Sequence, residues 1–152
     1  YGWFMRRRFS VQYTGVDITP EIIVRAHQKY PQGNFSVKQI LTPKKSRQQF
    51  DFVVASGIFN RRVLRHRQFI RETVVRMYSL CRIGVAFNIL STKADFKESK
   101  EYYADPGKLL NECLALTRNA ILRHDYMTHD FTIYLYKDSP QHGNTRFKTE
   151  KK

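Results

Sequence analysis

One carboxylate stands between an apolar run typical of a strand and the start of a helix. The run is Tyr13 to Val16, the acid is Asp17, and the helix start is Thr19–Glu21. A carboxylate can accept two hydrogen bonds side by side, which suits the diol of a ribose. Ligands of open α/β sheets bind beyond the carboxyl ends of the strands. The position of Asp17 therefore favours a nucleotide-type ligand, and an acid that only serves the helix start is the alternative.

Two later apolar runs also end in residues suited to a ligand. Ser56, Gly57, Ile58 and Phe59 follow the run that begins at Phe50. Gly57 allows a close approach of the backbone, and Ile58 or Phe59 offers an apolar surface to an aromatic ring. Asn60 is a candidate cap for the next helix.

The second of these runs ends at Asn88, and Ser91 and Thr92 come soon after it. Asn88 is a candidate contact for a second substrate. Tyr102 and Tyr103 lie in the long loop that follows, and long loops in small domains are often lids or binding loops. Plain packing is the alternative for both tyrosines.

The segment Arg123-His124-Asp125-Tyr126, with His129 nearby, has the residue types of a general base. A structural cluster at a strand end is the simpler interpretation. The spacing of His124, Asp125 and His129 does not match a metal site.

The elements that would position these residues alternate along the chain. We expect a short helix within 1–10, strands at 11–18, 34–41, 50–59 and 82–90, and helices at 19–31, 61–81 and 105–117. Thr19 and Asp105 are the expected helix caps. Segments 119–126 and 130–137 predict an antiparallel hairpin. This order predicts an α/β fold with a mostly parallel sheet and a terminal hairpin. The run at 50–59 is typical of a strand buried on both faces.

Composition limits the classes of function. The length of 152 residues fits one domain, and no apolar run approaches the roughly 20 residues of a membrane helix. Cys81 and Cys113 lie in apolar patterns, which indicates buried thiols in a reducing cytoplasm rather than a disulfide or metal site. The net charge of +14 permits a nucleic-acid partner. The arginine-rich predicted helix at 61–81 supplies a solvated face, with Arg61, Arg65 and Arg76 opposite its apolar stripe, or a phosphate-facing patch.

Taken in order, the stretches "YGWFMRRRF", "YTGVDITPEII", "NFSVKQIL", "FDFVVASGIFN", "GVAFNILST" and "ILRHDYMTHDFTIYLYK" resemble the class I S-adenosylmethionine-dependent methyltransferases. The resemblance covers residues 1–137, and residues 138–152 are expected to form a basic flexible tail. It implies a Rossmann-like, doubly wound sheet, with Asp17 as the ribose-binding acid and Ile18 beside it. The stretch "FDFVVASGIFN" is similar to the strand whose end lines the cofactor site, which implies cofactor contacts for Ser56, Gly57 and Phe59.

Two departures from the family pattern stand out. The family's first, central strand and most of its glycine-rich loop are missing, and Gly2 resembles the last glycine of that loop. We therefore expect a parent protein that carries this strand upstream of Tyr1. The position that is often an acid contacting adenine is Gln39, whose amide oxygen can accept the same hydrogen bond, with Ile40 next to it. A surface glutamine is the alternative.

The resemblance thus implies methyl transfer from S-adenosylmethionine to an acceptor, for which a small molecule is the first expectation. Asn88, Tyr102 and Tyr103 are the expected acceptor contacts, and no catalytic residue or metal ligand is assigned. The alternatives are an RNA methyltransferase, a non-catalytic basic nucleic-acid-binding module on a degenerate methyltransferase scaffold, and a nicotinamide dehydrogenase. The terminal hairpin favours a methyltransferase over a dehydrogenase.

Overall fold

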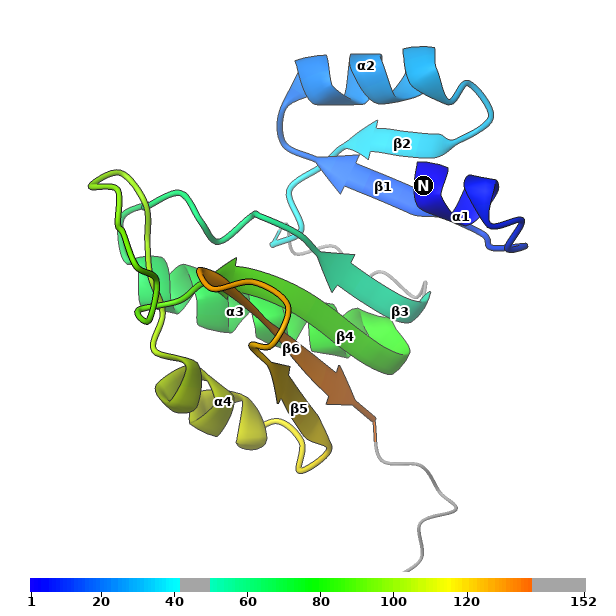
Figure 1. The fold of residues 1–152 in the computed structure, drawn as a ribbon. Helices are drawn as coiled ribbons and strands as arrows, with labels where there is room; N and C mark the ends of the chain where they lie inside the picture. The colour runs from blue at the N-terminus through cyan, green and yellow to red at the C-terminus, as the bar shows by residue number, and fades with distance from the viewer. Residues whose placement is uncertain (42–49, 138–152) are drawn as a thin grey trace, which may run out of the picture. The chain divides into compact units, whose positions relative to one another are not determined.

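The computed structural model describes residues 1–41 and 50–137, in two units, Tyr1–Lys45 and Ser46–Lys152. Residues 42–49, between two of the expected strands, and the expected tail at 138–152 lie outside the described residues. Helices and strands carry the labels of Figure 1.

The first unit is a small parallel sheet with two helices. Its elements are α1 (Gly2–Arg6), β1 (Thr14–Asp17), α2 (Pro20–Lys29) and β2 (Asn34–Val37). β1 and β2 pair in parallel with Asp17 opposite Val37, so the two strands end at the same edge. α2 begins where the sequence predicts, with Thr19 at the N-cap position and Pro20 in the first turn. The side chain of Thr19 makes no capping hydrogen bond, which corrects that part of the prediction.

The second unit is a four-stranded sheet with two helices. It contains β3 (Phe50–Ala55), α3 (His66–Leu80), β4 (Cys81–Leu90), α4 (Pro106–Leu114), β5 (Ala120–Arg123) and β6 (Asp130–Tyr136). The strand order is β3-β4-β6-β5. β3 and β4 are parallel, whereas β6 runs antiparallel to both β4 and β5. This arrangement confirms the predicted α/β class and the predicted terminal hairpin.

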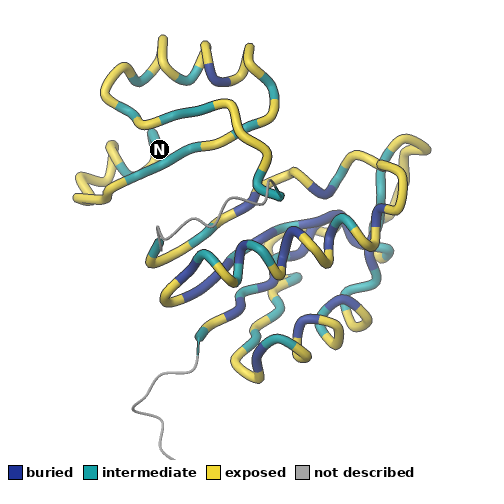
Figure 2. Tube along the Cα trace, turned by 180° about the vertical axis from the view of Figure 1, so that it is seen from behind, coloured by how far each residue is buried: buried dark blue, intermediate teal, exposed yellow. Residues whose placement is uncertain are grey.

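One face of this sheet forms the core of the second unit. Phe87, Ile89, Phe131, Ile133 and Leu135 are almost wholly buried. They alternate along β4 and β6 and therefore point to the same side of the sheet. Helix α3 lies behind β4 in Figure 1, and Figure 2 shows the helix from the other side, with buried and exposed residues alternating along it.

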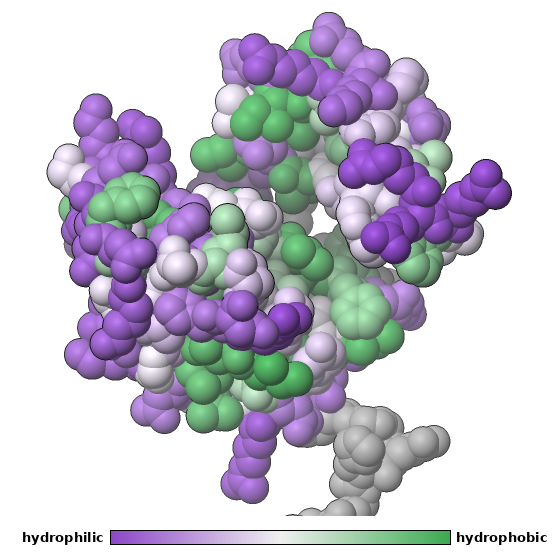
Figure 3. Space-filling model, viewed as in Figure 1, coloured by the Kyte–Doolittle hydropathy of each residue, from purple (hydrophilic) through white to green (hydrophobic). Residues whose placement is uncertain are grey.

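The opposite face of the sheet is partly bare. On β3 the side chain of Phe52 is 58% exposed and that of Val54 is 70% exposed. The prediction that this strand is buried on both faces is therefore wrong. The apolar side chains of β3 are covered only on the face that packs on α3, and β3 is the edge strand of its sheet. Figure 3 shows apolar surface gathered over this front face of the sheet.

Helix α3 is shorter than the pattern predicts. It begins at His66, because Arg65 adopts a left-handed conformation with φ 53° and ends the preceding loop. Ile70, Val74 and Met77 form its buried stripe, whereas Val63, which helical spacing would add to this stripe, lies before the helix and is 45% exposed. Asn60 is therefore not the cap of this helix. Arg61 and Arg65 belong to the loop, and Arg76 is half-buried rather than solvated.

Helix α4 starts as the sequence predicts. The carboxylate of Asp105 accepts a hydrogen bond from the backbone N–H of Lys108 at 2.9 Å. Cys81 and Cys113 are both buried free thiols. None of the helices within residues 1–41 and 50–137 is long and apolar enough to cross a membrane.

Candidate functional site

Asp17 occupies the end of β1, at the carboxyl edge of the two-stranded sheet. One of its carboxylate oxygens, Oδ1, accepts a hydrogen bond from the backbone N–H of Thr19 at 2.8 Å. This contact holds the turn between β1 and α2. Within the described residues the second oxygen, Oδ2, accepts no hydrogen bond, so it remains available to a donor such as a hydroxyl group.

The neighbours of Asp17 at this edge are the other predicted cofactor residues of the first unit. Because Asp17 pairs with Val37, Gln39 lies two residues beyond the end of the adjacent strand. Ile18 is 70% exposed, Gln39 is exposed, and Ile40 is half-buried. A carboxylate, an amide and two apolar side chains at one edge offer the contacts that a ribose hydroxyl, an adenine amino group and an adenine ring require. The residues present therefore fit a nucleoside.

Gly2 has a packing reason to be glycine. A Cβ atom on it would lie 2.0 Å from the hydroxyl oxygen of Tyr30, so any side chain would displace that ring. Tyr30 in turn meets Tyr1 edge to face, with ring centroids 5.3 Å apart. These contacts explain the glycine without a ligand, and its role in cofactor binding stays a prediction.

In the second unit, Gly57 follows β3 in a conformation that favours glycine, with φ 73°. A Cβ atom on it would meet nothing within 4 Å, so the backbone faces open space. Its N–H donates a hydrogen bond to Oδ1 of Asn88 at 2.8 Å. The structure thus brings together two predicted site residues that are 31 positions apart. Their meeting follows from the parallel pairing of β3 and β4.

The neighbours of Gly57 differ in what they can offer a ligand. Ser56 is exposed, and Ile58 is 42% exposed. Phe59 has no exposed surface, because it packs edge to face against Phe69 and Phe87. Ile58 is therefore the apolar side chain of this loop that has surface available, and Phe59 anchors the loop to the core.

Asn88 connects Gly57 to a buried acid that the sequence did not single out. Its Nδ2 donates to Oδ2 of Asp130 at 2.7 Å, and Asp130 is only 7% exposed. Asp130 is the first residue of β6 and pairs with Leu90 at the end of β4. In the sequence it reads as a polar start to an alternating strand, and nothing in the pattern signals its burial.

Two loops at the same edge of this sheet are tied together. The N–H of Tyr102 donates to the carbonyl of Asn60 at 2.8 Å, and that of Arg62 donates to the carbonyl of Lys100 at 3.0 Å. The ring of Tyr102 stacks on that of His66, with centroids 3.9 Å apart. Tyr103 donates its hydroxyl proton to Glu101 and accepts from the N–H of Glu98, both at 2.9 Å. The predicted acceptor-binding tyrosines are thus held in place by the protein itself.

His66 is the second residue that the sequence analysis missed. Its Nδ1 accepts a hydrogen bond from the N–H of Val63 at 3.1 Å, and its Nε2 lies 2.9 Å from the carbonyl oxygen of Phe59. This pattern requires a neutral ring with the proton on Nε2. Burial lowers the pKa of His66, which keeps the ring neutral. The histidine therefore fixes the loop between β3 and α3.

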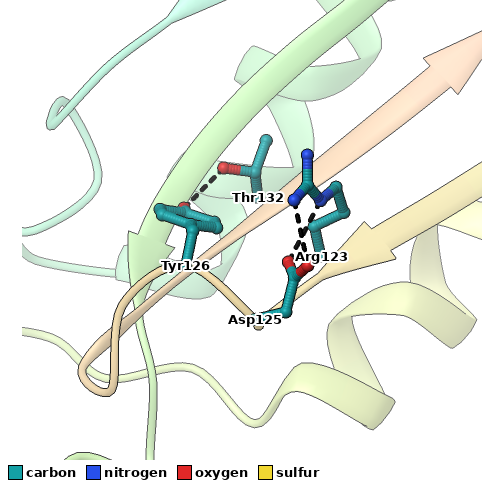
Figure 4. Close-up of polar contacts among 4 residues, drawn as sticks. All are labelled: Arg123, Asp125, Tyr126 and Thr132. Atoms are coloured by element: carbon teal, nitrogen blue, oxygen red, sulfur yellow. Dashed lines mark hydrogen bonds and ion pairs between the residues drawn. The ribbon is translucent and has the colours of Figure 1, made fainter.

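The segment around Asp125 forms a strand-end cluster rather than a catalytic pair (Figure 4). Arg123 donates from Nε and from one terminal nitrogen to the two oxygens of Asp125, at 3.0 and 2.9 Å. These bonds lower the pKa of the Asp125 carboxyl. The hydroxyl groups of Tyr126 and Thr132 lie 2.6 Å apart. Asp125 is thus engaged by Arg123, which supports the simpler interpretation of this segment.

Ser91 is fully buried, and its hydroxyl oxygen accepts from the N–H of Lys93 at 3.1 Å. Thr92 joins the long loop back to the sheet through a backbone bond to Ala104. Within the described ranges, no three histidine, cysteine or acidic side chains are grouped so that they could hold a metal ion.

Comparison with known proteins agrees with this geometry. No family model matches the chain. The "Putative methyltransferase Rv1506c" of Mycobacterium tuberculosis is 32% identical over 140 residues, which span 88% of this chain and 83% of that protein.

Solved structures show the same fold at low identity. Magnesium protoporphyrin IX methyltransferase from Synechocystis, with S-adenosylhomocysteine bound, matches with a TM-score of 0.68 at 10% identity, over 86% of this chain and 66% of that one. The same enzyme with S-adenosylmethionine bound is covered to 62% of its length. The plantazolicin methyltransferase BpumL matches with a TM-score of 0.67 at 9% identity, over 91% of this chain and 72% of that one. The chain therefore spans slightly less than two thirds of the first of these enzymes.

The α/β fold with its terminal antiparallel hairpin is that of the Rossmann-like methyltransferases. The chain belongs to the class I S-adenosylmethionine-dependent methyltransferases, as its identity with the mycobacterial protein and its fold together show. The cofactor of this family is S-adenosylmethionine, and several of the similar structures contain it or its product.

Proposed function

We propose that this protein transfers the methyl group of S-adenosylmethionine to a small-molecule acceptor. The observation that carries the proposal is the carboxylate of Asp17, which ends β1 with one oxygen bound to the turn and the other available. The similar structures include enzymes named for protoporphyrin and plantazolicin, which favours a small acceptor over a nucleic acid. The two buried free thiols fit a reducing cytoplasm.

In this proposal the residues of the first unit bind the nucleoside. Oδ2 of Asp17 accepts from a ribose hydroxyl, the amide oxygen of Gln39 accepts from the adenine amino group, and Ile18 and Ile40 pack on the ring. Gly2 keeps the start of α1 close to Tyr30. In the second unit, taken by itself, Ser56, Gly57 and Ile58 are the residues that we assign to the cofactor, and Phe59 anchors their loop.

The bound cofactor supplies a methyl group on a sulfonium, which an acceptor atom displaces in one step. The protein must then hold the acceptor in line and exclude water, which is a positioning task. Asn88 fixes the Gly57 backbone, and the loop that carries Tyr102 and Tyr103 is tied to the loop after β3. We assign these three residues to the acceptor side, with no general base among them.

Calorimetric titration with S-adenosylhomocysteine tests the proposal. The intact protein is expected to bind, and Asp17→Ala is expected to bind at least tenfold more weakly, because a hydrogen bond to a charged group contributes about 1.5–3 kcal/mol. Asp17→Asn is the sharper variant, since its amide oxygen still accepts from Thr19 while the charge is lost. Glu21→Gln, in the first turn of α2, is the matched control and should bind normally.

Absence of binding by the intact protein would refute the proposed function. Equal affinities for the wild type, Asp17→Asn and Asp17→Ala would refute the role of Asp17 and leave the family unaffected.

A further inference from the structure

The carboxylate of Asp130 is buried, and only one of its two oxygens has a hydrogen-bond partner among the described residues. Oδ2 accepts from Asn88 at 2.7 Å. Oδ1 is buried as well and has no hydrogen-bond partner among the described residues. An ionised carboxylate has about four lone-pair sites, and a buried charge without partners is unfavourable. The side chain is therefore equipped for a further donor.

Arg123, the cation on the neighbouring strand β5, is already engaged by another acid. Arg123 lies on the same sheet face and directs two of its nitrogens at Asp125 (Figure 4). The ion pairs formed within the described residues are those of Arg67, Arg82 and Arg123, and none of them includes Asp130. Within the described residues, Asp130 therefore has no ion-pair partner.

The register of the sheet shows which groups surround this charge. Directly opposed residues in an antiparallel pair point to the same face, and so do alternate residues of one strand. Asn88 is opposite Thr132, and Thr132 is also opposite Arg123. Asp130 lies two residues before Thr132 and therefore shares that face. The hydroxyl group of Tyr126 completes this polar group through its contact with Thr132.

Tyr126 lies near enough to Asp130 for the carboxylate to affect its hydroxyl group. Burial raises the pKa of its hydroxyl, and the negative charge of Asp130 raises it further. The phenol and the carboxylate therefore lie within electrostatic range of each other. Both stand at the carboxyl end of β4, the edge at which Gly57 faces open space.

We propose that Asp130 is an acceptor-binding residue, whose Oδ1 takes a hydrogen bond from a protonated amine of the methyl acceptor. This inference rests on the proposed function and adds a substrate class to it. The buried carboxylate lacks an ion-pair partner and a second hydrogen-bond donor. An ammonium group supplies both, since it is a cation and carries three donors. Its remaining donors suit the oxygens of Tyr126 and Thr132. Acceptors that would place a carboxylate or a phosphate here are disfavoured by repulsion.

Binding of two matched probes tests the assignment in the full chain. Benzylamine and benzoate have the same ring and opposite charges, and their affinities are measured by chemical-shift titration of the ¹⁵N-labelled protein. Benzylamine should bind the wild type, with shifts at Asn88 and Asp130, and should bind Asp130→Asn at least tenfold more weakly. Benzoate should bind more weakly than benzylamine. Asp51→Asn removes an equal charge at the other end of the sheet, where Asp51 pairs with Arg82, and should leave benzylamine binding unchanged.

Asp130→Glu is the second variant, and it should retain most of the amine affinity because the charge stays. Failure of the wild type to bind benzylamine would overturn the proposal. So would equal binding by Asp130→Asn, or an equal loss in Asp51→Asn. A parallel titration with S-adenosylhomocysteine keeps the two proposals apart, since Asp130→Asn should bind it normally. Absence of S-adenosylhomocysteine binding by the wild type would refute the proposed function but not the binding of an amine at Asp130.

Discussion

The hydrogen bond between Asn88 and Asp130 allows a sharp test of the geometry at the carboxyl edge of the second unit. In Asn88→Asp the new side chain has the same shape as the old one, but it is a carboxylate. It would place an acceptor where Nδ2 of Asn88 now donates to Asp130 at 2.7 Å. Two negative charges would then face each other beside a largely buried group.

The size of the effect follows from the separation. Carboxylate charges roughly 4 Å apart repel by about 4 kcal/mol at an effective dielectric constant near 20. We expect Asn88→Asp to lower the free energy of unfolding by about 3–4 kcal/mol at neutral pH. Asn88→Ala removes the hydrogen bond without adding a charge, and it should cost about 1.5–3 kcal/mol.

The assay is thermal and urea unfolding of the full chain, followed by circular dichroism. A loss of this size corresponds to a fall in Tm of roughly 10 °C for a protein of this length. The exchanged variant Asn88→Asp/Asp130→Asn restores a donor opposite an acceptor, and the N–H of Gly57 can still donate to the carboxylate introduced at position 88. It should recover stability to within about 1 kcal/mol of the wild type.

Two results would contradict this reasoning. If Asn88→Asp were as stable as the wild type, the two side chains could not lie at hydrogen-bonding distance. If the exchanged variant were no more stable than Asn88→Asp, the loss would not come from the repulsion between positions 88 and 130.

Three further predictions concern single residues outside this pair. Burial lowers the pKa of His66 below its usual value of 6.5, so the stabilising contribution of the neutral ring is complete above that pH and is lost as the pH falls toward the lower folded-state pKa. The free energy of unfolding should therefore differ more between pH 7.5 and pH 5.5 in the wild type than in His66→Gln. Burial raises the pKa of Cys113 to about 12 and also raises that of Cys81. Neither thiol should therefore react with Ellman's reagent at pH 8 until urea unfolds the chain, and rapid reaction of the folded protein would contradict their burial. Asp105→Ala should destabilise the protein by about 1 kcal/mol through loss of the cap on α4, whereas Asp105→Ser should be nearly neutral, and equal losses would argue against the cap.

Local signals in the sequence were enough to predict most elements of the fold. Thr19-Pro20 and Asp105-Pro106 mark the starts of α2 and α4, because both combine a capping residue with a proline suited to the first turn. The alternating run after Asp130 predicts β6 and the hairpin. Helical spacing alone starts α3 too early, because it includes Val63 but gives no sign of the left-handed Arg65. The exposure of Phe52 and Val54 was equally hidden, because an apolar run does not show whether both faces of a strand are covered.

The candidate site was predictable where it depends on strand ends. Asp17, Gln39, Gly57 and Asn88 all follow apolar runs, and the parallel pairing places them at sheet edges. The supporting residues were not predictable, because their roles arise from contacts between distant segments. His66 binds Phe59 and stacks on Tyr102, 36 residues further along the chain by their numbers.

Asp130 is the missed residue on which the proposed amine site depends. A carboxylate at the first position of a strand is usually solvated, and the sequence offers no reason to treat this one differently. The antiparallel register sets it against Leu90, and its side chain reaches Asn88. Asn88 then has one end on the backbone of Gly57 and the other on a buried charge, so the loop after β3 and the start of β6 are mechanically linked. A ligand that bonds Oδ1 of Asp130 would stabilise this whole chain of contacts. Binding of an amine should therefore raise the Tm of the wild type more than that of Asn88→Ala, in which the link to Gly57 is cut.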